Sequence, residues 1–479
     1  YLKGKKKMVF SSTVFLFLFL PLVLLIYFLS PQALKNTVLL AASLFFYAWG
    51  EPKFVIIMMI SILLNYIFGL LVDKYRDKKT KVKWILIVMV FANILILGIF
   101  KYANFIIENV NSLFSLNIEN PNIPLPIGIS FFTFQAISYV IDIYRKDGDV
   151  QKNPLDTALY ISLFPQLVAG PIVRYQTVAN QIKKRTVTLE GFTEGIKRFI
   201  VGLAKKMLLA NNCGLIADQI FSMQPSEMST GLAWIGIIAY SLQIYFDFSG
   251  YSDMAIGLGR MFGFTFLENF NYPYISKSIS EFWRRWHISL GSWFRDYIYI
   301  PLGGNRKGNL ITYRNLFIVW LTTGIWHGAN WTFIIWGLYY GFFIMIERAY
   351  LGKKLVRLPI IIQHAYALII VIIGWVFFRS ETLGYAFEYI GVMFGINSVS
   401  FWNLDASYYF NENIILFLLS ILVSMGILPY LQRKLDCIIS KPALIAREGI
   451  AYIYYIALLI TSVSYIISSS FNPFIYFNF

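Results

Sequence analysis

Long apolar stretches alternate with short charged ones along most of the chain. Segments close to the length needed to cross a bilayer occupy residues 9–30, 36–50, 54–72, 84–104, 126–144, 229–248, 358–378, 413–431 and 449–468. Three further stretches contain Pro, Gly or charges and are typical of half-length helices buried in protein: 156–173, 315–327 and 384–395. The pattern predicts an all-α membrane protein with about ten to twelve transmembrane helices, together with re-entrant and interfacial helices.

Loop charges indicate the orientation in the membrane. Lys and Arg crowd into residues 73–83 and 174–206, whereas 102–144 and 207–259 contain none. Since cytoplasmic loops carry an excess of Lys and Arg, we expect the first two regions in the cytoplasm and the Lys/Arg-free loops outside. The lysines before Met8 contradict this rule, so we interpret residues 1–7 as a tag remnant or an upstream mis-start.

Composition agrees with a membrane protein and argues against several other classes. The chain is 58% hydrophobic and 14% charged, unlike soluble domains. A net charge of +16 would suggest nucleic-acid binding in a soluble protein, but these charges lie between apolar runs, so we expect no nucleic-acid partner. Cys213 and Cys437 are the only cysteines, and there is no metal-ligand spacing, phosphate loop or Gly-x-Ser-x-Gly elbow. We therefore expect no bound metal or cofactor.

Residues 276–300 have the pattern of one helix lying at or just inside the membrane interface. Aromatic residues recur every three or four positions on one side, and polar residues line the other. Trp and Arg alone would indicate a structural interfacial helix. His287 lies on the aromatic side, which makes it a candidate for chemistry. His364 stands alone in an apolar run, and we interpret it as structural.

His327 lies at the break between two apolar half-segments. Because Arg314 and Arg348 are both expected on the cytoplasmic side, the chain between them must enter the membrane and return, with His327 at the tip of the hairpin. An ionisable residue there is costly and indicates function; the alternative is a neutral histidine making one interhelical hydrogen bond. Gly324 and Gly328 would permit the close backbone approach that a substrate channel needs.

Three carboxylates also lie in apolar surroundings: Asp142, Asp247 and Asp253. The last two are six positions apart, so they share a helical face only if the helix breaks at Ser249–Gly250. The carboxylates could orient a histidine or bind a polar substrate group. They could equally be buried partners of Arg260 or Arg174.

Three motifs around the two histidines resemble the membrane-bound O-acyltransferases. They are Arg284-Arg-Trp-His-Ile-Ser-Leu-Gly-Ser-Trp-Phe-Arg-Asp-Tyr297, Pro301-Leu-Gly-Gly-Asn305 and Trp326-His-Gly-Ala-Asn-Trp331. Residues 164–171 and 245–253 are most similar to the bacterial alginate O-acetylation branch, which is related to the teichoic acid D-alanylation membrane protein. The resemblance covers about residues 8–350.

The resemblance implies that His327 is the essential histidine, that His287 is the second active-site position, and that both face a central tunnel joining the two membrane faces. It also implies an acyl thioester donor such as acetyl-CoA on the cytoplasmic side, and an acceptor reached from outside. In this branch a separate extracytoplasmic acyltransferase passes the acyl group to a polysaccharide. We therefore expect residues 8–479 to form one domain of the bacterial cytoplasmic membrane, with N-terminal helices, a catalytic core and C-terminal helices over 8–104, 105–350 and 351–479.

In this interpretation His327 is the general base, while His287 orients the reactants or stabilises the oxyanion. An acyl-histidine intermediate stays open. Further substrate contacts are expected from Arg284, Arg285, Trp286, Asp247, Ser249, Asp253 and Asn330. The competing interpretation is a transporter or a flippase for lipid-linked sugars, which would consume no thioester.

Overall fold

Helices make up the structure, as the sequence pattern predicts. The computed structural model describes residues 8–168, 170–427, 441–469 and 471–475, and for 441–447 it describes only the backbone. The described residues contain no strand. The prediction for residues 1–7 lies outside the described part of the chain. By contact pattern the chain divides into two compact units, residues 1–199, 251–267 and 476–479 on one hand and 200–250 and 268–475 on the other. Two helices contribute to both units, α9 (Leu189–Ala204) and α11 (Thr230–Met261).

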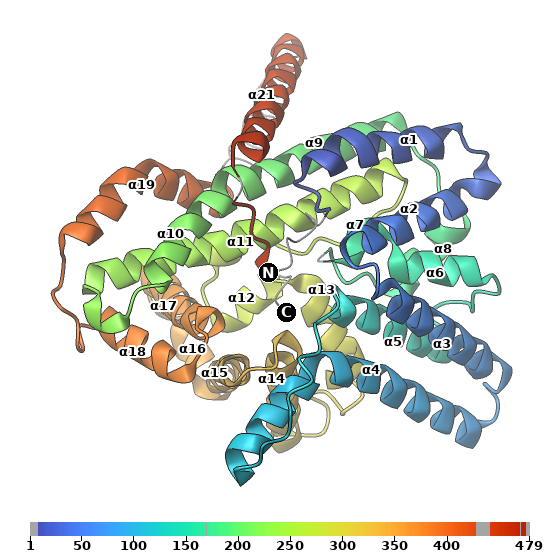
Figure 1. Cartoon of the computed structure of the whole chain (residues 1–479), viewed down its shortest axis with the longest axis horizontal. Coiled ribbons are helices and arrows are strands. Elements are labelled where there is room, and N and C mark those ends of the chain that lie inside the picture. The colour runs from blue at the N-terminus through green and yellow to red at the C-terminus, as the bar shows by residue number, and fades with distance from the viewer. Residues whose placement is uncertain (1–7, 169, 428–440, 470, 476–479) are drawn as a thin grey trace. The chain divides into compact units, whose positions relative to one another are not determined.

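The first unit contains the N-terminal helices (Figure 1). They are η1 (Phe15–Phe19), α1 (Leu20–Leu29), η2 (Gln32–Leu34), α2 (Lys35–Gly50), α3 (Val55–Lys74), α4 (Lys79–Phe114), α5 (Ile129–Arg145), α6 (Pro154–Ser162), α7 (Phe164–Leu167) and α8 (Tyr175–Lys183). Helix α3 packs against α4 and α5, and α2 packs against α6. Phenylalanine rings fill the interior, where Phe164 contacts Phe10, Phe19 and Phe46. This packing buries the apolar faces that the sequence pattern marks.

The second unit contains the segments with both candidate histidines. Its further elements are η3 (Lys205–Ala210), α10 (Asn211–Phe221), η4 (Pro225–Glu227), η5 (Pro273–Ile275), α12 (Ile279–Arg285), α13 (Ile288–Phe294), η6 (Arg295–Tyr299), α14 (Asn309–His327), α15 (Trp331–Ile346), η7 (Glu347–Leu351), α16 (Gly352–Leu355), α17 (Ile360–Arg379), α18 (Leu383–Met393), α19 (Leu404–Ser424) and α21 (Lys441–Ser468). Side-chain caps fix several helix starts. Ser278 caps α12, Asn330 caps α15 and Thr382 caps α18.

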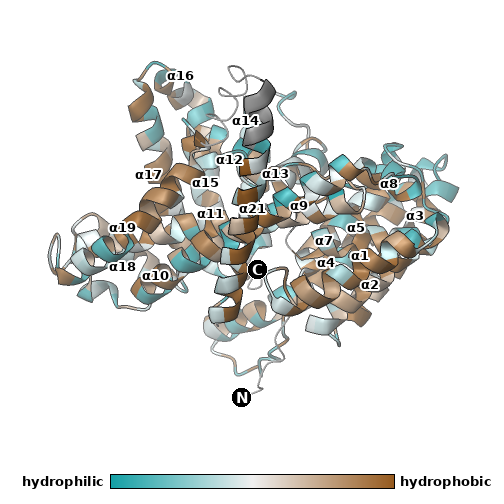
Figure 2. Ribbon diagram, turned by 90° about the horizontal axis from the view of Figure 1, so that it is seen from above, coloured by the Kyte–Doolittle hydropathy of each residue, from teal (hydrophilic) through white to brown (hydrophobic). Residues whose placement is uncertain are grey.

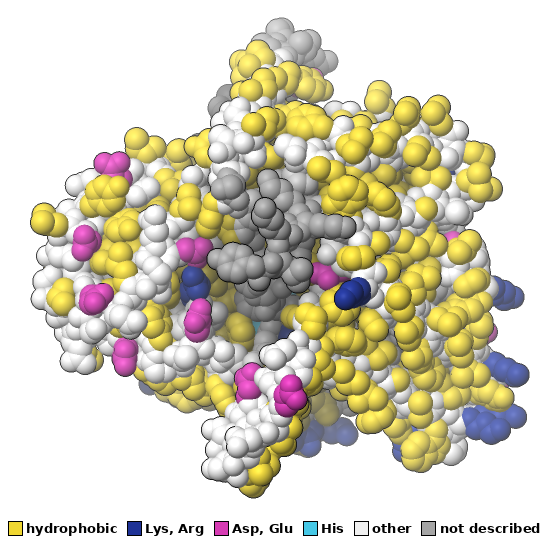
Figure 3. Space-filling view, viewed as in Figure 1, with side chains coloured by type: hydrophobic (Ala, Val, Ile, Leu, Met, Phe, Trp, Pro, Cys, Tyr) yellow, Lys and Arg dark blue, Asp and Glu magenta, His cyan; other side chains and the backbone are white. Residues whose placement is uncertain are grey.

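Seven helical segments of the described residues are long and apolar enough to cross a membrane. They are Val55–Lys74, Lys79–Phe114, Leu189–Phe221, Thr230–Met261, Ile360–Arg379, Leu404–Ser424 and Glu448–Ser468, and Phe15–Leu29 is a shorter apolar helix. Hydrophobic residues run along α1 and α2, while hydrophilic ones surround α8 (Figure 2). The visible face is largely hydrophobic, with Lys and Arg gathered at the edge beside the α3–α4 turn (Figure 3). A multi-pass membrane protein is thus confirmed, whereas the count of ten to twelve crossings stays a prediction.

Much of the predicted cytoplasmic loop over residues 174–206 is helical. Residues 174–188 contain the short helix α8, and residues from Leu189 onward belong to a helical segment that continues to Phe221 and is long and apolar enough to span a membrane. A buried ion pair makes Lys206 compatible with an apolar environment. The cytoplasmic location of residues 174–206 stays a prediction.

The prediction of one helix over residues 276–300 is also wrong. Helix α12 ends at Arg285, His287 adopts a left-handed backbone with φ of 44°, and α13 starts at Ile288. A neighbouring loop satisfies the backbone groups that this break releases. The Ile288 N–H donates to the Asn269 carbonyl at 3.0 Å, and the Arg285 carbonyl accepts from Asn271 N–H at 2.9 Å. Tertiary contacts therefore replace the helical hydrogen bonds that periodicity alone predicts.

The hairpin around His327 is confirmed by α14 and α15, which pack against each other (Figure 1). Glycines bring these helices together: a Cβ on Gly324 would lie 2.6 Å from the Phe333 carbonyl oxygen, and one on Gly337 would lie 2.5 Å from that of Trp320. A Cβ on Gly328 would meet the Phe333 ring at 2.2 Å. The glycines expected to line a substrate channel thus serve helix packing within the hairpin.

Candidate active site

His327 is the last residue of α14 and its side chain is buried, with 3% of its surface exposed. Aromatic rings pack around the imidazole: the centroid distances are 4.9 Å to Trp326, 4.7 Å to Trp336 and 5.3 Å to Phe378. Helix C-termini carry a partial negative charge that stabilises nearby cations. The His327 ring thus lies at the negative end of α14.

His287 lies in the break between α12 and α13 and is 1% exposed. Positive φ is uncommon for residues other than glycine, although histidine adopts it more often than most. Such strained backbone is frequent at functional sites because surrounding contacts must hold it in place. The edge of the Phe248 ring packs on the imidazole at a centroid distance of 4.6 Å.

Asn269 determines which nitrogen of His287 carries a proton. Its Oδ1 accepts hydrogen bonds from the backbone N–H of Ser289 at 3.2 Å and from the Ser289 hydroxyl at 2.9 Å. A backbone N–H can only donate, so the amide oxygen must face this junction. The same oxygen lies 3.1 Å from Nδ1 of His287. Nδ1 therefore donates, and Nε2 of the neutral ring carries the lone pair.

Burial lowers the pKa of His287 to about 3. Its charged form is disfavoured because the ring lies among apolar side chains. The imidazole is thus neutral throughout the range in which unperturbed histidines titrate, about pH 5 to 8. If the reaction rate changes between about pH 5 and 8 because a histidine titrates, that histidine is a residue other than His287.

One aromatic cluster contains both histidines. The Trp326 ring lies 6.4 Å from the His287 ring and 4.9 Å from the His327 ring, measured between centroids. The other rings of the cluster are Phe282, Trp283, Trp286, Trp320, Trp336, Tyr340, Trp375 and Phe378. The cluster therefore gathers both candidate histidines in apolar surroundings, which strengthen electrostatic interactions.

Trp286, a predicted substrate contact, is an internal member of this cluster. Its ring stacks on Phe282 at 5.5 Å and tilts against Trp375 at 4.9 Å. Asn330, another predicted contact, uses both ends of its amide for structure. Its Oδ1 accepts from Thr332 N–H at 3.0 Å, and its Nδ2 donates to the Glu381 carbonyl at 2.9 Å. These contacts explain both residues without a substrate.

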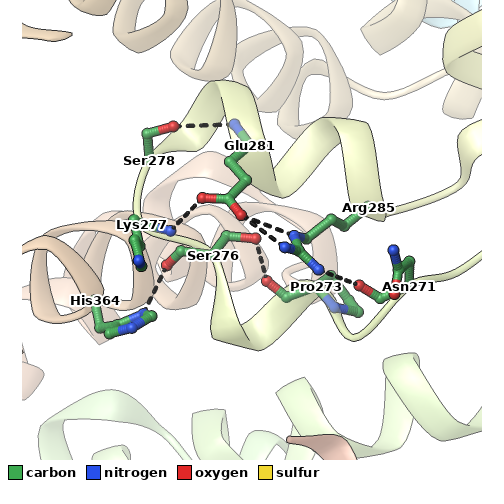
Figure 4. Close-up of polar contacts among 8 residues, drawn as sticks. All are labelled: Asn271, Pro273, Ser276, Lys277, Ser278, Glu281, Arg285 and His364. Atoms are coloured by element: carbon green, nitrogen blue, oxygen red, sulfur yellow. Dashed lines mark hydrogen bonds and ion pairs between the residues drawn. The ribbon is translucent and has the colours of Figure 1, made fainter. Parts of the chain in front are cut away.

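The two predicted arginines of α12 differ in their surroundings. Arg285 pairs with Glu281 at 2.9 Å and donates to the Asn271 carbonyl at 3.1 Å, so it holds the loop beside the His287 break (Figure 4). Glu281 in turn accepts from the backbone N–H of Lys277. Arg284 is exposed. Only Arg284 is thus displayed at the surface, whereas Arg285 has a structural task.

His364 lies outside the aromatic cluster. Its Nδ1 is 3.1 Å from the carbonyl oxygen of Ser276, in the segment that leads into α12 (Figure 4). Ser276 also donates from its hydroxyl to the Pro273 carbonyl. This contact supports the structural interpretation of His364.

Two of the three predicted carboxylates, Asp247 and Asp253, form ion pairs with lysine or arginine. Asp247 lies 2.6 Å from the ammonium group of Lys206, with both side chains almost fully buried. Asp253 pairs with Arg198 at 2.8 Å. Helix α11 runs through Ser249 without a break, so the two aspartates lie on different helical faces. The pairing of a predicted carboxylate with Arg260 or Arg174 stays a prediction.

The pair of Asp247 and Lys206 also holds the C-terminal segment. Asp247 accepts from the backbone N–H of Ile475 at 2.9 Å, and Lys206 donates to the carbonyl of Pro473. Ser249 is buried in the same helix. Asp142 accepts from the backbone N–H of Gln176, at the start of α8. The substrate roles of these residues stay predictions.

Two residues of this region were missed by sequence analysis. Asn269 lies 18 positions before His287, and Lys206 lies in a segment that was assigned to a loop. Polar residues in an otherwise apolar run were the available signal for both. Their partners are distant in sequence, so periodicity could not identify them.

Comparison with known proteins identifies relatives over most of the chain. The membrane-bound O-acyltransferase family, MBOAT, matches residues 149–379. The chain is 48% identical over 405 residues to a probable alginate O-acetylase of Pseudomonas putida, covering 83% of this chain and 82% of the relative. It is 38% identical over 442 residues to a peptidoglycan O-acetyltransferase of Helicobacter pylori, covering 85% and 84%. It is 31% identical over 230 residues to a teichoic acid D-alanyltransferase of Bacillus subtilis, covering 45% and 56%. Both candidate histidines lie inside the matched region.

Proposed function

Because the chain belongs to the membrane-bound O-acyltransferase family and is a membrane O-acyltransferase, we propose that it moves an acetyl group from a cytoplasmic thioester donor to O-acetylate an extracellular polysaccharide or cell-wall glycan. The relatives named for alginate and peptidoglycan acetylation favour acetyl as the acyl group. The charge-bearing loops favour the bacterial cytoplasmic membrane as its location.

The observation that carries this proposal is the shared aromatic cluster around His287 and His327. In the proposed reaction His327 takes the proton of the acceptor hydroxyl as its oxygen attacks the thioester carbonyl carbon. The carbon–sulfur bond breaks, and the departing thiolate receives that proton from His327. Each step uses one ring nitrogen and needs no metal ion.

The tautomer of His287 favours one of its two expected roles. Stabilising an oxyanion requires an N–H donor aimed at it, but the N–H of this ring is aimed at Asn269. The lone pair on Nε2 can instead accept a hydrogen bond and orient a hydroxyl group. We therefore assign His287 to orienting the acceptor, with His327 as the base.

The donor side is proposed from the charge around α12. Lys277, Arg284 and Arg285 precede His287, and Arg306 and Lys307 follow it. Phosphate groups of a coenzyme A thioester would interact with such cations, of which Arg284 is the exposed one on α12. The acyl group would then pass to a separate extracytoplasmic acyltransferase as the partner protein.

Acetyl-CoA turnover in oriented vesicles tests the proposal against transport. Acetyl-CoA does not cross membranes, so inverted vesicles, which expose the cytoplasmic face, should release free thiol when the partner acyltransferase and a glycan acceptor are enclosed. Right-side-out vesicles should release little until they are permeabilised. Vesicles that contain inserted, folded protein but show no thiol release in either orientation would favour a transporter, because transport consumes no thioester.

Replacing Asn269 tests the role assigned to His287. Asn269→Ala removes the acceptor of the Nδ1 hydrogen bond and frees the ring to change tautomer, so we expect kcat to fall about ten- to a hundred-fold. The donor KM should change little. The matched control is Asn271→Ala in the same loop, because Asn271 contacts Arg285 through its backbone, which alanine retains. Equal kcat values for wild type and Asn269→Ala would show that this contact does not position the ring for catalysis.

A further inference from the structure

A polar pocket lies in the first unit, and none of its lining residues is a candidate histidine or a member of the aromatic cluster. Its volume is about 300 Å³. Three segments line it. They are the start of α2 with Lys35 and Asn36, the start of α6 with Asn153 and Asp156, and the end of α8 and the residues after it with Lys183 and Arg185. These segments are far apart in sequence and meet only in the folded unit.

Arg185 gives the pocket a buried cation. Its side chain is only 9% exposed, and its Nη1 donates to Asn36 Oδ1 at 2.7 Å. Its Nε donates to the Phe262 carbonyl at 3.1 Å, and the guanidinium stacks over the Phe264 ring at 4.3 Å. Within the part of the chain that the structure describes, Nη2 is buried and has no hydrogen-bond partner. A buried guanidinium with an unused donor in a pocket wall calls for an acceptor.

Two helix N-termini contribute further positive potential. Lys35, Asn36 and Thr37 form the first turn of α2, which has 16 residues, and Asn153 caps α6, which has nine. Helix N-termini carry a partial positive charge that attracts anions. The pocket therefore combines a buried arginine, two lysines and two helix starts.

Two carboxylates reduce this charge without cancelling it. Asp156 accepts a hydrogen bond from Asn36 Nδ2 at 2.9 Å within the pocket wall. Asp149 pairs with Lys183 at 3.1 Å, where both side chains are largely exposed. Two carboxylates thus face three cations, Lys35, Lys183 and Arg185. The ion pair of Asp149 and Lys183 is weak because it is exposed.

We propose that this pocket binds a phosphoryl group, supplied by the headgroup of an anionic phospholipid or by a soluble phosphate. A phosphoryl group offers several acceptor oxygens, which match the unused guanidinium donor and the lysines. The volume suits a headgroup rather than an acyl chain. Leu155, which lines the pocket and is exposed, would lie along the chains of a lipid bound there.

The position of the pocket agrees with a lipid of the cytoplasmic leaflet. Two hydrogen bonds indicate that the pocket segments lie on the same side of the unit as the cationic residues 73–83. Arg76 donates to the carbonyl of Ile143 at the end of α5, and Tyr66 donates to the carbonyl of Lys152. Anionic lipids are concentrated on the cytoplasmic side, where each basic residue adds to their attraction.

Native mass spectrometry of the full-length protein in detergent tests this site. The probes are phosphatidylglycerol and phosphatidylcholine, added at equal concentrations. Wild type should retain phosphatidylglycerol, and Lys35→Gln with Lys183→Gln should retain about ten-fold less or lower still. The matched control, Lys184→Gln with Lys79→Gln, removes the same charge from positions that do not line the pocket and should retain as much as wild type.

Inorganic phosphate supplies the second arm of the experiment. Thermal unfolding is measured with increasing phosphate in phosphatidylcholine nanodiscs, since a bound ligand stabilises the folded state. Stabilisation of wild type and of the control, but not of the pocket variant, would identify a soluble phosphate as the ligand. The proposal would be overturned if the pocket variant and its control lost phosphatidylglycerol equally and were stabilised by phosphate equally. The lysines would then only attract anionic surfaces in general.

Discussion

A His327→Gln enzyme should insert and fold but transfer acyl groups about a hundred to ten thousand times more slowly than wild type. Gln fills much of the space between Trp326, Trp336 and Phe378 and keeps hydrogen-bonding groups, but it has no basic nitrogen. The measurement is acyl transfer per milligram of membrane-inserted protein, with glycan acetylation as the cellular readout.

His327→Ala should lose as much activity and also unfold at a lower temperature. Three aromatic rings contact the imidazole, so truncation leaves a cavity in the cluster. His364→Ala is the matched control, because His364 contacts a backbone carbonyl outside the cluster and should stay close to wild type in activity. Full activity in a well-folded His327→Gln variant would remove the general-base mechanism. The family assignment would stand, and another residue would have to take the proton.

An Asp247→Asn variant should be destabilised by about 3–5 kcal/mol. The substitution leaves the ammonium group of Lys206 buried, with 3% of its side chain exposed, and without its counter-charge. Asp218→Asn is the matched control. It breaks the pair with Arg379, in which the side chains are 28% and 42% exposed, and should cost about 0–1 kcal/mol. The measurement is unfolding of the detergent-solubilised protein at equal concentration.

A double variant separates ion pairing from packing. Replacing both members, Lys206→Met with Asp247→Leu, removes both buried charges and should recover most of the stability that Asp247→Asn loses. The contacts to Pro473 and Ile475 would still be missing, so recovery of full wild-type stability is not expected. Equal effects of Asp247→Asn and Asp218→Asn would show that burial does not make the Asp247 pair special.

Local sequence patterns were enough to predict the class of the protein and its candidate histidines. Apolar runs of membrane-spanning length specify helices, because only internally hydrogen-bonded segments are stable in lipid. The cationic residues on either side of His327 predicted its hairpin, which the structure contains. Motifs around His287 and His327 predicted the family, which the relatives confirm. These features are local, so they can be read from neighbouring positions.

Tertiary structure alone decided how those residues are held. Periodicity predicted an unbroken helix through His287, but Asn269 and Asn271 supply the hydrogen bonds that let it break there. The pairing of Asp247 with Lys206 joins two helical segments, and a helical pattern specifies which face a residue occupies without specifying its partner. Contacts between distant segments form only when the chain packs, and they set the tautomer of His287 and the burial of its ring.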